Sequence, residues 1–476
     1  MGETNSEVKD SLACFRTSQG VEIRGNLLRL TRHLVVLEIC NPGSVLQTSE
    51  VLSEFKIIWN DRTLYSGRAV VRNFVNTSLV TVCEVSLENS WVDVDFSLST
   101  TTADTLRGQF EGFVQEWQKL YRVAPEFKAL LADLQTFLTD LRLWLEQVEL
   151  GIRSSPSADR AELEQQISQT LAQPILFHID AMHERFEEAA RQIPTDQRDA
   201  HQVLVRRQLH PLFLCAPFAY RTYQKPLGYA GDYEIMNMIH RNTFEGASLY
   251  AKMIHFWLVR QWAAQSVRNR IVHMKARLIE ETLRVMRERR PARILNLGCG
   301  PAREVQDFIA ERAFSDYAEF TLVDFDAETL AHVASALGKA KRDHGRTTGV
   351  HLSRMSVNQL LRFSTRPSSN PLGSGFDMIY CGGLFDYLSD RICKRLVSMF
   401  YDLVTPGGLV VVANMHDERR PFRYMVEFLL DWHLIYRDAA CMSSFVPEAA
   451  APDSWSVVHE PTAANMFLEV RKPLEP

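Results

Sequence analysis

The sequence predicts a small all-β barrel and a helical connector, followed by a doubly wound, Rossmann-like α/β domain. Three observations predict this order. Short β-branched runs separated by turn residues come first, apolar residues at helical spacing come next, and strands that alternate with helices begin at Arg293. We place the barrel at residues 10–100, the connector at 103–205 and the α/β domain, which begins with a helical lid, at 206–476.

The composition is that of a globular protein. With 46% hydrophobic and 23% charged residues, the chain can bury substantial cores. The formal net charge of -5 argues against a general nucleic-acid binder, which needs a basic face. The cysteines show no metal-ligand spacing, so we expect no metal site and a reduced, cytoplasmic setting. No apolar run reaches the ~20 residues of a spanning helix, so we expect no stable membrane insertion.

The barrel is predicted from β-rich runs at 25–28, 33–39, 55–59, 67–71 and 78–82. Turn signals at 41–43 and 60–61 separate some of them. This layout resembles a PilZ-type barrel. A PilZ domain that binds nucleotides carries an RxxxR motif followed by [DN]xSxxG, and Arg24, Arg29 and Arg32 do not form such a pair. We therefore favour a docking or dimerisation barrel over one that binds a cyclic dinucleotide.

The connector is predicted to be helical. Its apolar positions step alternately by four and three residues, which is a heptad seam. The seam could pair with a second subunit or with other helices of the same chain, so either the barrel or the connector could support a homodimer. Ser157 or Asp159 is positioned to cap the helix that follows. The seam consists of Leu130, Leu134, Phe137, Leu141, Trp144 and Val148.

A glycine-containing turn opens the α/β domain. The apolar run from Arg293 to Leu297 leads into Gly298 and Gly300, and a helix is expected next. Glycines after a strand let a ligand approach the backbone, and the start of the helix offers free N–H groups. A second strand ends at Asp324, where a carboxylate can accept hydrogen bonds from both hydroxyls of a ribose. The alternative role, capping the next helix, can be filled by Asp326.

Two further motifs favour a methyltransferase over a dehydrogenase. The run from Phe376 to Cys381 reads as a strand that begins with Phe-Asp, and Pro406-Gly407-Gly408 turns into another strand. Together with the glycine turn, they resemble the class I S-adenosylmethionine-dependent methyltransferases. The resemblance implies S-adenosyl-L-methionine as cofactor, with Arg268 pairing with the methionine carboxylate. The cofactor-binding residues that it implies are Arg268, Asn296, Gly298, Gly300, Asp324, Ser356, Val357, Gly382 and Leu384.

A narrower resemblance covers residues 205–440. The stretches at 228–233, 298–305, 383–388 and 431–437 are similar to those of the extracellular-factor methyltransferases. That family is associated with 3-hydroxypalmitic acid methyl ester, a signalling lipid. The resemblance implies a small-molecule acceptor and carboxyl O-methylation of a 3-hydroxy fatty acid.

The acceptor is expected at the same sheet edge, beneath the lid. Arg437 is our candidate for recognising a carboxylate, and His416 could act as a base or a donor. Alternatives are O- or N-methylation of another metabolite and a regulator that binds S-adenosylmethionine or a nucleotide without turnover. The catalytic candidates are Tyr229, Tyr387, His416 and Arg437, and the substrate-binding candidates are Asp232, Tyr233 and Tyr436.

Overall fold

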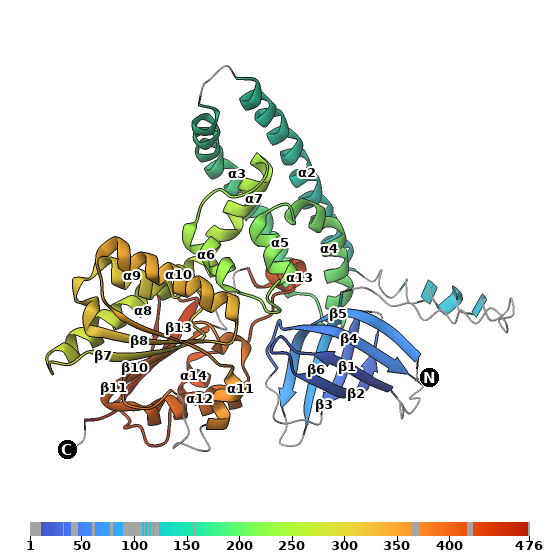
Figure 1. The fold of residues 1–476 in the computed structure, drawn as a ribbon. Coiled ribbons are helices and arrows are strands. Elements are labelled where there is room, and N and C mark those ends of the chain that lie inside the picture. The colour runs from blue at the N-terminus through green and yellow to red at the C-terminus, as the bar shows by residue number, and fades with distance from the viewer. Residues whose placement is uncertain are drawn as a thin grey trace.

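The computed structural model describes residues 11–31, 33–39, 46–59, 62–76, 80–88, parts of 107–118, 123–155, 159–363, 372–416 and 422–474. The turn signals at 41–43 and 60–61, and the residues Arg32 and Ser157, lie outside this set. Figure 1 shows three parts, a barrel, a group of helices that rises above it and an α/β unit beside both.

Six antiparallel strands close the predicted barrel in the order β1-β2-β3-β6-β5-β4. Side chains along β2 alternate between buried and exposed, so Ile23 and Leu27 point inward. The rings of Phe15 and Phe55 stack in the interior with centroids 5.5 Å apart. The prediction of a small all-β barrel is confirmed. The strands are β1 (Ser11–Arg16), β2 (Glu22–Leu30), β3 (Leu34–Ile39), β4 (Val51–Trp59), β5 (Arg62–Asn76) and β6 (Thr81–Leu87).

The long helices α2 (Pro125–Ser154) and α3 (Arg160–Arg191) pack against each other within the chain. Asp159 caps α3 by accepting a hydrogen bond from the backbone N–H of Glu162, as predicted. The predicted seam of α2 is correct for its amino-terminal half and wrong at Trp144, which is 50% exposed. The residues buried in this part of α2, Leu138, Leu145 and Ile152, keep a seven-residue repeat that runs one position after the predicted one, so Trp144 lies beside the contact face and not in it.

The remaining helices of this part share one core with α2 and α3. A segment far along the chain, α13, completes it by packing on α3, α4 and α5. Its N-terminus is held by the buried carboxylate of Glu187, which accepts from the backbone N–H groups of Tyr424 and Met425 at 3.1 and 2.7 Å. These helices are α4 (Arg198–Phe213), α5 (Pro217–Gln224), α6 (Tyr233–Arg241), α7 (Leu249–Arg260) and α13 (Arg423–Leu430).

The α/β unit is built on a seven-stranded sheet in the order β12-β13-β11-β10-β7-β8-β9. Strands β7 to β11 are parallel, and β13 runs antiparallel between β11 and β12. Parallel strands with helices on both faces and an antiparallel pair at one edge form a doubly wound α/β sheet, so the predicted doubly wound fold is confirmed. The strands are β7 (Ala292–Leu297), β8 (Ala318–Asp324), β9 (Gly349–Arg354), β10 (Phe376–Cys381), β11 (Val404–Met415), β12 (Trp455–His459) and β13 (Asn465–Arg471).

Helices cover both faces of the sheet (Figure 1). Helices α8, α9 and α10 pack on one face and α11, α12 and α14 on the other, which is why β10 is buried along its whole length. None of the described helices is both long and apolar enough to cross a membrane. The helices are α8 (Trp262–Met286), α9 (Arg303–Glu311), α10 (Ala327–His344), α11 (Val357–Phe363), α12 (Asp390–Leu403) and α14 (Ala439–Ser443).

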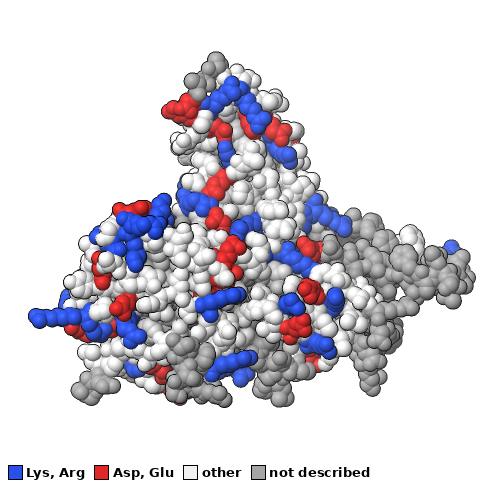
Figure 2. Space-filling view, viewed as in Figure 1, with Lys and Arg blue, Asp and Glu red and all other residues white. Residues whose placement is uncertain are grey.

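Charged side chains are mixed over the visible face of the molecule. Figure 2 shows Lys and Arg interspersed with Asp and Glu along the helices and across the α/β unit. Arg72 of the barrel forms an ion pair with Asp199 of α4. The barrel is thus held to the rest of the chain by specific polar contacts.

Candidate functional site

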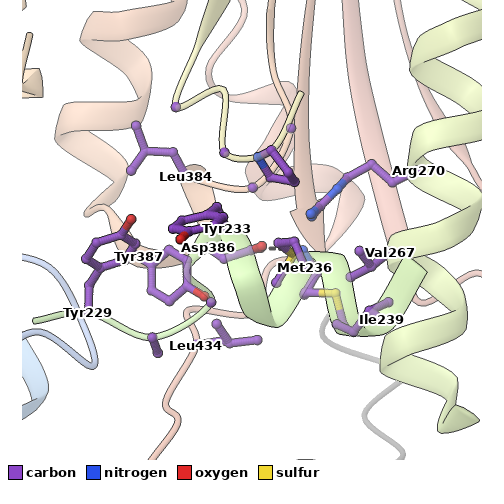
Figure 3. Close-up of a pocket in the computed structure, with 18 of the residues that line it drawn as sticks. Tyr229, Tyr233, Met236, Ile239, Val267, Arg270, Leu384, Asp386, Tyr387 and Leu434 are labelled. Atoms are coloured by element: carbon purple, nitrogen blue, oxygen red, sulfur yellow. Dashed lines mark hydrogen bonds between the residues drawn. The ribbon is translucent and has the colours of Figure 1, made fainter. Parts of the chain in front are cut away.

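A cavity of about 210 Å³ lies at the carboxyl ends of β7, β8 and β10. In open α/β sheets ligands bind in this crevice, at the point where the strand order reverses. Helices α6 and α8 contribute to its wall (Figure 3), and the segment around Trp432 and two barrel residues complete it. Most residues named from the sequence line it, namely Tyr229, Tyr233, Asn296, Gly298, Gly300, Asp324, Val357, Gly382, Leu384, Tyr387 and Tyr436.

The turn after β7 brings bare backbone to the cavity. Gly298 and Gly300 have φ angles of 67° and 50°, a region that favours glycine. The N–H groups of Gly298 and Cys299 both donate to the carbonyl of Val323, at 2.8 and 3.1 Å, which fixes the turn against β8. A side chain at Gly298 would meet Leu384 across the cavity at 3.4 Å. Because Gly298 and Gly300 carry no side chains, a ligand that lies along this turn would contact main-chain atoms.

Asp324 ends β8 inside the cavity and is only 6% exposed. Its carboxylate accepts hydrogen bonds from the backbone N–H groups of Gly300 at 3.2 Å and Asp326 at 3.1 Å. Burial raises the pKa of Asp324 to about 6. Asp326, and not Asp324, caps α10 by accepting from Thr329 N–H at 2.7 Å. Asp324 is consequently available to a ligand.

A buried polar group lies behind the glycine turn. Asn296 donates through its amide to Glu304 at 3.1 Å, and the Tyr380 hydroxyl donates to the same carboxylate oxygen at 2.7 Å. Burial raises the pKa of Glu304. The Oδ1 atom of Asn296 is buried and has no hydrogen-bond partner in the described structure. Because a buried acceptor without a partner is costly, it fits a ligand that brings a donor.

Two arginines of α8 have different surroundings. Arg268 donates to the backbone carbonyls of Ile239 at 3.0 Å and Val259 at 2.7 Å and does not line the cavity. Arg270 does line it and reaches from α8 toward the loop that carries Gly383 and Leu384 (Figure 3). The Arg270 guanidinium makes no hydrogen bond or ion pair with any described residue. Arg270 therefore supplies the guanidinium group in the cavity. The prediction that Arg268 pairs with a carboxylate there is wrong.

The lid segment, residues 228–233, contributes two tyrosines to the cavity wall. The Tyr229 ring lies 5.0 Å from that of Phe325, and its hydroxyl is 3.4 Å from Thr329 Oγ1. Tyr233 donates to Glu328 at 2.8 Å. Asp232 is fully buried outside the cavity, where it caps α6 and pairs with Arg221 at 2.9 Å. Asp232 therefore holds the lid in place and does not contact a ligand in the cavity.

A second group of polar residues comes after β10. Trp432 donates through its indole N–H to the Tyr387 hydroxyl at 3.0 Å. Asp386 lines the cavity, is 4% exposed and accepts from the backbone N–H of Met415 at 2.7 Å. Burial raises the pKa of Asp386 to about 6, although the positive charge of Arg270 opposes the shift. The cavity is thus lined by three carboxyl groups with raised pKa values, those of Glu304, Asp324 and Asp386.

Three further sequence assignments lie outside the cavity lining. Arg437 is nearly fully buried and donates to the carbonyls of Phe385 and Leu388, to Asn414 and to Asp390. With its donors committed there, it cannot anchor a carboxylate in the cavity. His416 lies beside the carbonyl of Ala463, and Ser356 accepts from Gln359 N–H near the start of α11. The proposed roles of Arg437, His416 and Ser356 are corrected accordingly.

Sequence reasoning missed Arg270, Glu304, Asp386 and the barrel residue Gln47 as lining residues. A signal for Arg270 was present. The residues of α8 that line the cavity recur every three or four positions, as expected for one face of a helix. Arg270 follows Val267 by three positions and lies on this face, whereas Arg268 follows Val267 directly and does not. The lining residues of α8 are Ala263, Ala264, Val267, Arg270, Ile271 and Met274.

No protein-family model and no curated protein matches the chain. Among solved structures, a possible exported protein from Bordetella parapertussis is 17% identical, covering 54% of this chain and 86% of its own, with a TM-score of 0.41. The N-methyltransferase NodS from Bradyrhizobium japonicum WM9, solved with S-adenosyl-L-homocysteine, is 13% identical over 42% and 86% of the two chains, with a TM-score of 0.29.

Magnesium protoporphyrin IX methyltransferase from Synechocystis PCC 6803 is 9% identical, covering 57% of this chain and 99% of its own, with a TM-score of 0.32. All three TM-scores lie below 0.5. The function of the chain must therefore be inferred from the residues of the cavity itself.

Proposed function

We propose that this chain is an S-adenosylmethionine-dependent methyltransferase that acts on a small molecule. The observation that carries the proposal is the combination at one sheet edge of the Gly298–Gly300 turn, the buried Asp324 carboxylate and the unpaired Oδ1 of Asn296. Each suits one part of the cofactor. Asp324 suits the two ribose hydroxyls, and the bare turn lets the methionine part lie close to the backbone.

The remaining polar groups of the cofactor also have matching residues. An α-ammonium group would satisfy Asn296 Oδ1, and the Arg270 guanidinium suits the methionine carboxylate. Phe325 and Leu384 line the cavity and offer apolar surfaces to an adenine ring. The residues therefore fit the ribose, the adenine ring and the ammonium and carboxylate groups of S-adenosylmethionine.

When bound, S-adenosylmethionine supplies a methyl group on a positively charged sulfur. The chain's own contribution is to hold the acceptor in line and to keep water out. Met236, Ile239 and Leu434 line the cavity with apolar surface. The Tyr387 hydroxyl, fixed by Trp432, is a rigidly held donor or acceptor for the acceptor molecule.

The leading acceptor is the carboxylate of a 3-hydroxy fatty acid, which would give a methyl ester. The resemblance at four stretches and the apolar lining support it. A carboxylate is already ionised near neutral pH and needs no base. Among the described lining residues, however, Arg270 is the only arginine or lysine, so a carboxylate acceptor would have to share it with the methionine carboxylate.

A second candidate is the methylation of a hydroxyl or amine, which Asp386 favours. Its pKa of about 6 leaves it ionised at neutral pH and able to take a proton. The negative charge of Asp386 would also repel a carboxylate nucleophile and attract a protic one. On electrostatic grounds this candidate fits the cavity better, while the resemblance favours the first.

We also propose that the barrel is related to PilZ domains. Six closed antiparallel strands are compatible with it, and the missing RxxxR pair argues against a cyclic dinucleotide ligand. We propose that the barrel is a docking element and not a receptor for a cyclic dinucleotide.

Incubation of the full chain with methyl-labelled S-adenosylmethionine tests these options. A labelled product from 3-hydroxy fatty acids that mild alkali hydrolyses supports the ester. A label that resists alkali, on an amine or hydroxyl compound, supports the second candidate. Tight cofactor binding without transfer to any compound of a crude extract would instead indicate a regulator.

A further inference from the structure

The barrel contributes two glutamines to the wall of the cavity, Gln19 and Gln47. Gln47 is only 4% exposed. Its side-chain amide has no hydrogen-bond partner in the part of the chain that the structure describes, although it carries two donors and an acceptor. Because Gln47 lines the cavity and its amide is not engaged by the chain, the amide is open to a ligand with complementary polar atoms.

A buried carboxylate fixes the two barrel loops that carry these glutamines. Glu50 accepts from the Ser18 N–H at 2.9 Å, the Ser18 hydroxyl at 2.6 Å and the Gln47 N–H at 3.0 Å. Glu50 is only 1% exposed, and this burial raises the pKa of its carboxyl group. Gln19 and Gln47 are therefore held on neighbouring loops as one surface.

The same loops are bound to segments that line the cavity. The Val51 N–H donates to the carbonyl of Gly228 at 2.7 Å, next to Tyr229. The Thr48 N–H donates to the carbonyl of Tyr387 at 3.2 Å. Since these are backbone contacts, the barrel surface keeps a set position relative to the cavity.

The barrel surface lies beside the ends of β8 and β9. Gln19 accepts from the side-chain amide of Asn358 at 3.4 Å, and Asn358 directly follows the lining residue Val357. Asp324, which would hold the ribose, ends the neighbouring strand β8. A base attached to that ribose and directed toward Val357 would have its outer edge near Gln19 and Gln47.

We propose that the barrel completes the cofactor site and that Gln47, with Gln19 beside it, recognises the edge of the adenine ring. A glutamine amide can accept a hydrogen bond from the adenine amino group and donate one to a neighbouring ring nitrogen. This inference rests on the proposed function, because it takes S-adenosylmethionine to be the ligand. It gives the barrel a direct part in binding instead of a purely structural one.

Calorimetry on the full chain tests this with two ligands, S-adenosylhomocysteine and S-inosylhomocysteine, in which oxygen replaces the adenine amino group. We expect the wild-type protein to bind the adenine compound more tightly, by roughly ten-fold or more. Gln47→Met keeps an unbranched side chain of similar length and should remove most of this preference. Gln47→Leu, which also removes the donors and the acceptor, should reduce it likewise, and serves if the methionine variant does not fold.

Asn26→Ala is the matched control, because Asn26 is an exposed amide on β2 of the same barrel. It should leave both affinities unchanged. If the wild-type protein binds both ligands equally, or if a folded Gln47 variant keeps the wild-type preference, the inference is wrong while the proposed function stands. If the wild-type protein binds neither ligand, the proposed function itself fails.

Discussion

Arg268 and Arg270 lie on the same helix, and only Arg270 enters the cavity. Two residues along an α-helix correspond to a rotation of roughly 200°, so the two side chains leave α8 on nearly opposite sides. Arg268 joins the ends of α6 and α7 through the carbonyls of Ile239 and Val259. Arg270 stays free of such contacts and lies against the backbone of Gly383. One arginine is thus structural, and the other is available to a ligand.

The first prediction concerns Arg270. Arg270→Ala should weaken S-adenosylmethionine binding by about 1.5–3 kcal/mol, the contribution of a hydrogen bond to a charged group, as measured by calorimetry. Arg270→Lys should recover part of the affinity, because it keeps the charge but loses the two-pronged geometry.

Methylthioadenosine, which lacks the methionine carboxylate, is the control ligand for that variant. Its affinity should be equal for the wild-type protein and Arg270→Ala. An equal loss for both ligands would show that Arg270 acts by shaping the cavity and not by pairing with a carboxylate.

The residues at the strand ends could be predicted because local sequence defines them. Gly298, Gly300 and Asp324 each come directly after an apolar run, and parallel strands bring their carboxyl ends to one edge. The prediction that Arg437 binds a carboxylate was wrong because its neighbours in the sequence do not indicate which backbone carbonyl groups its guanidinium contacts. Its partners Phe385 and Leu388 lie about fifty positions earlier in the sequence.

The contribution of the barrel could not be predicted from the sequence. Gln47 lies far from the α/β domain along the chain and reaches the cavity only through the docking of the barrel, for which no local pattern exists. The same holds for α13, which leaves the α/β domain to complete the helical core. Contacts of this kind depend on how whole elements pack against one another. The periodicity of apolar residues in one sequence predicts helices and strands but not these contacts.

The second prediction separates Asp324 from Asp326. Asp324→Ala should weaken cofactor binding by roughly 1–3 kcal/mol, because the ribose hydroxyls lose a charged acceptor. Asp326→Ala should lower the free energy of unfolding by about 1 kcal/mol through loss of the α10 cap and leave cofactor affinity unchanged. Calorimetry and thermal unfolding of both variants measure this, and the reverse pattern would refute the ribose assignment.

The third prediction is a pH dependence of cofactor affinity. The pKa of Asp324 is raised to about 6, so the carboxylate is ionised above that pH and protonated below it. Because the ionised form is the better acceptor of two hydroxyl groups, affinity should fall as the pH drops through 6 and level off above about 7. Asp324→Asn should remove this dependence. A wild-type affinity that stays constant between pH 5 and 8 would contradict the prediction.

The fourth prediction concerns Asp386 and decides between the acceptor classes. If Asp386 takes a proton from a hydroxyl or amine, kcat at saturating cofactor should fall below pH 6, where the carboxyl group is protonated. Asp386→Asn keeps an acceptor for the Met415 N–H and should lower kcat by about 10²–10⁴-fold. Retention of the wild-type rate by this variant would point to a carboxylate acceptor, which needs no base.

The last prediction assigns Arg437 to stability. Arg437→Met keeps an apolar stem against the Phe445 ring. It leaves the carbonyls of Phe385 and Leu388 and the side-chain oxygen of Asn414 without the hydrogen bonds that Arg437 donates. Since each buried acceptor without a partner costs about 1–3 kcal/mol, the free energy of unfolding should fall by roughly 3 kcal/mol, measured by urea denaturation. The same change at Arg391, an exposed position on α12, should cost less than about 0.5 kcal/mol. If the Arg437→Met protein has wild-type stability and a raised KM for the acceptor, Arg437 binds the acceptor and this prediction is wrong.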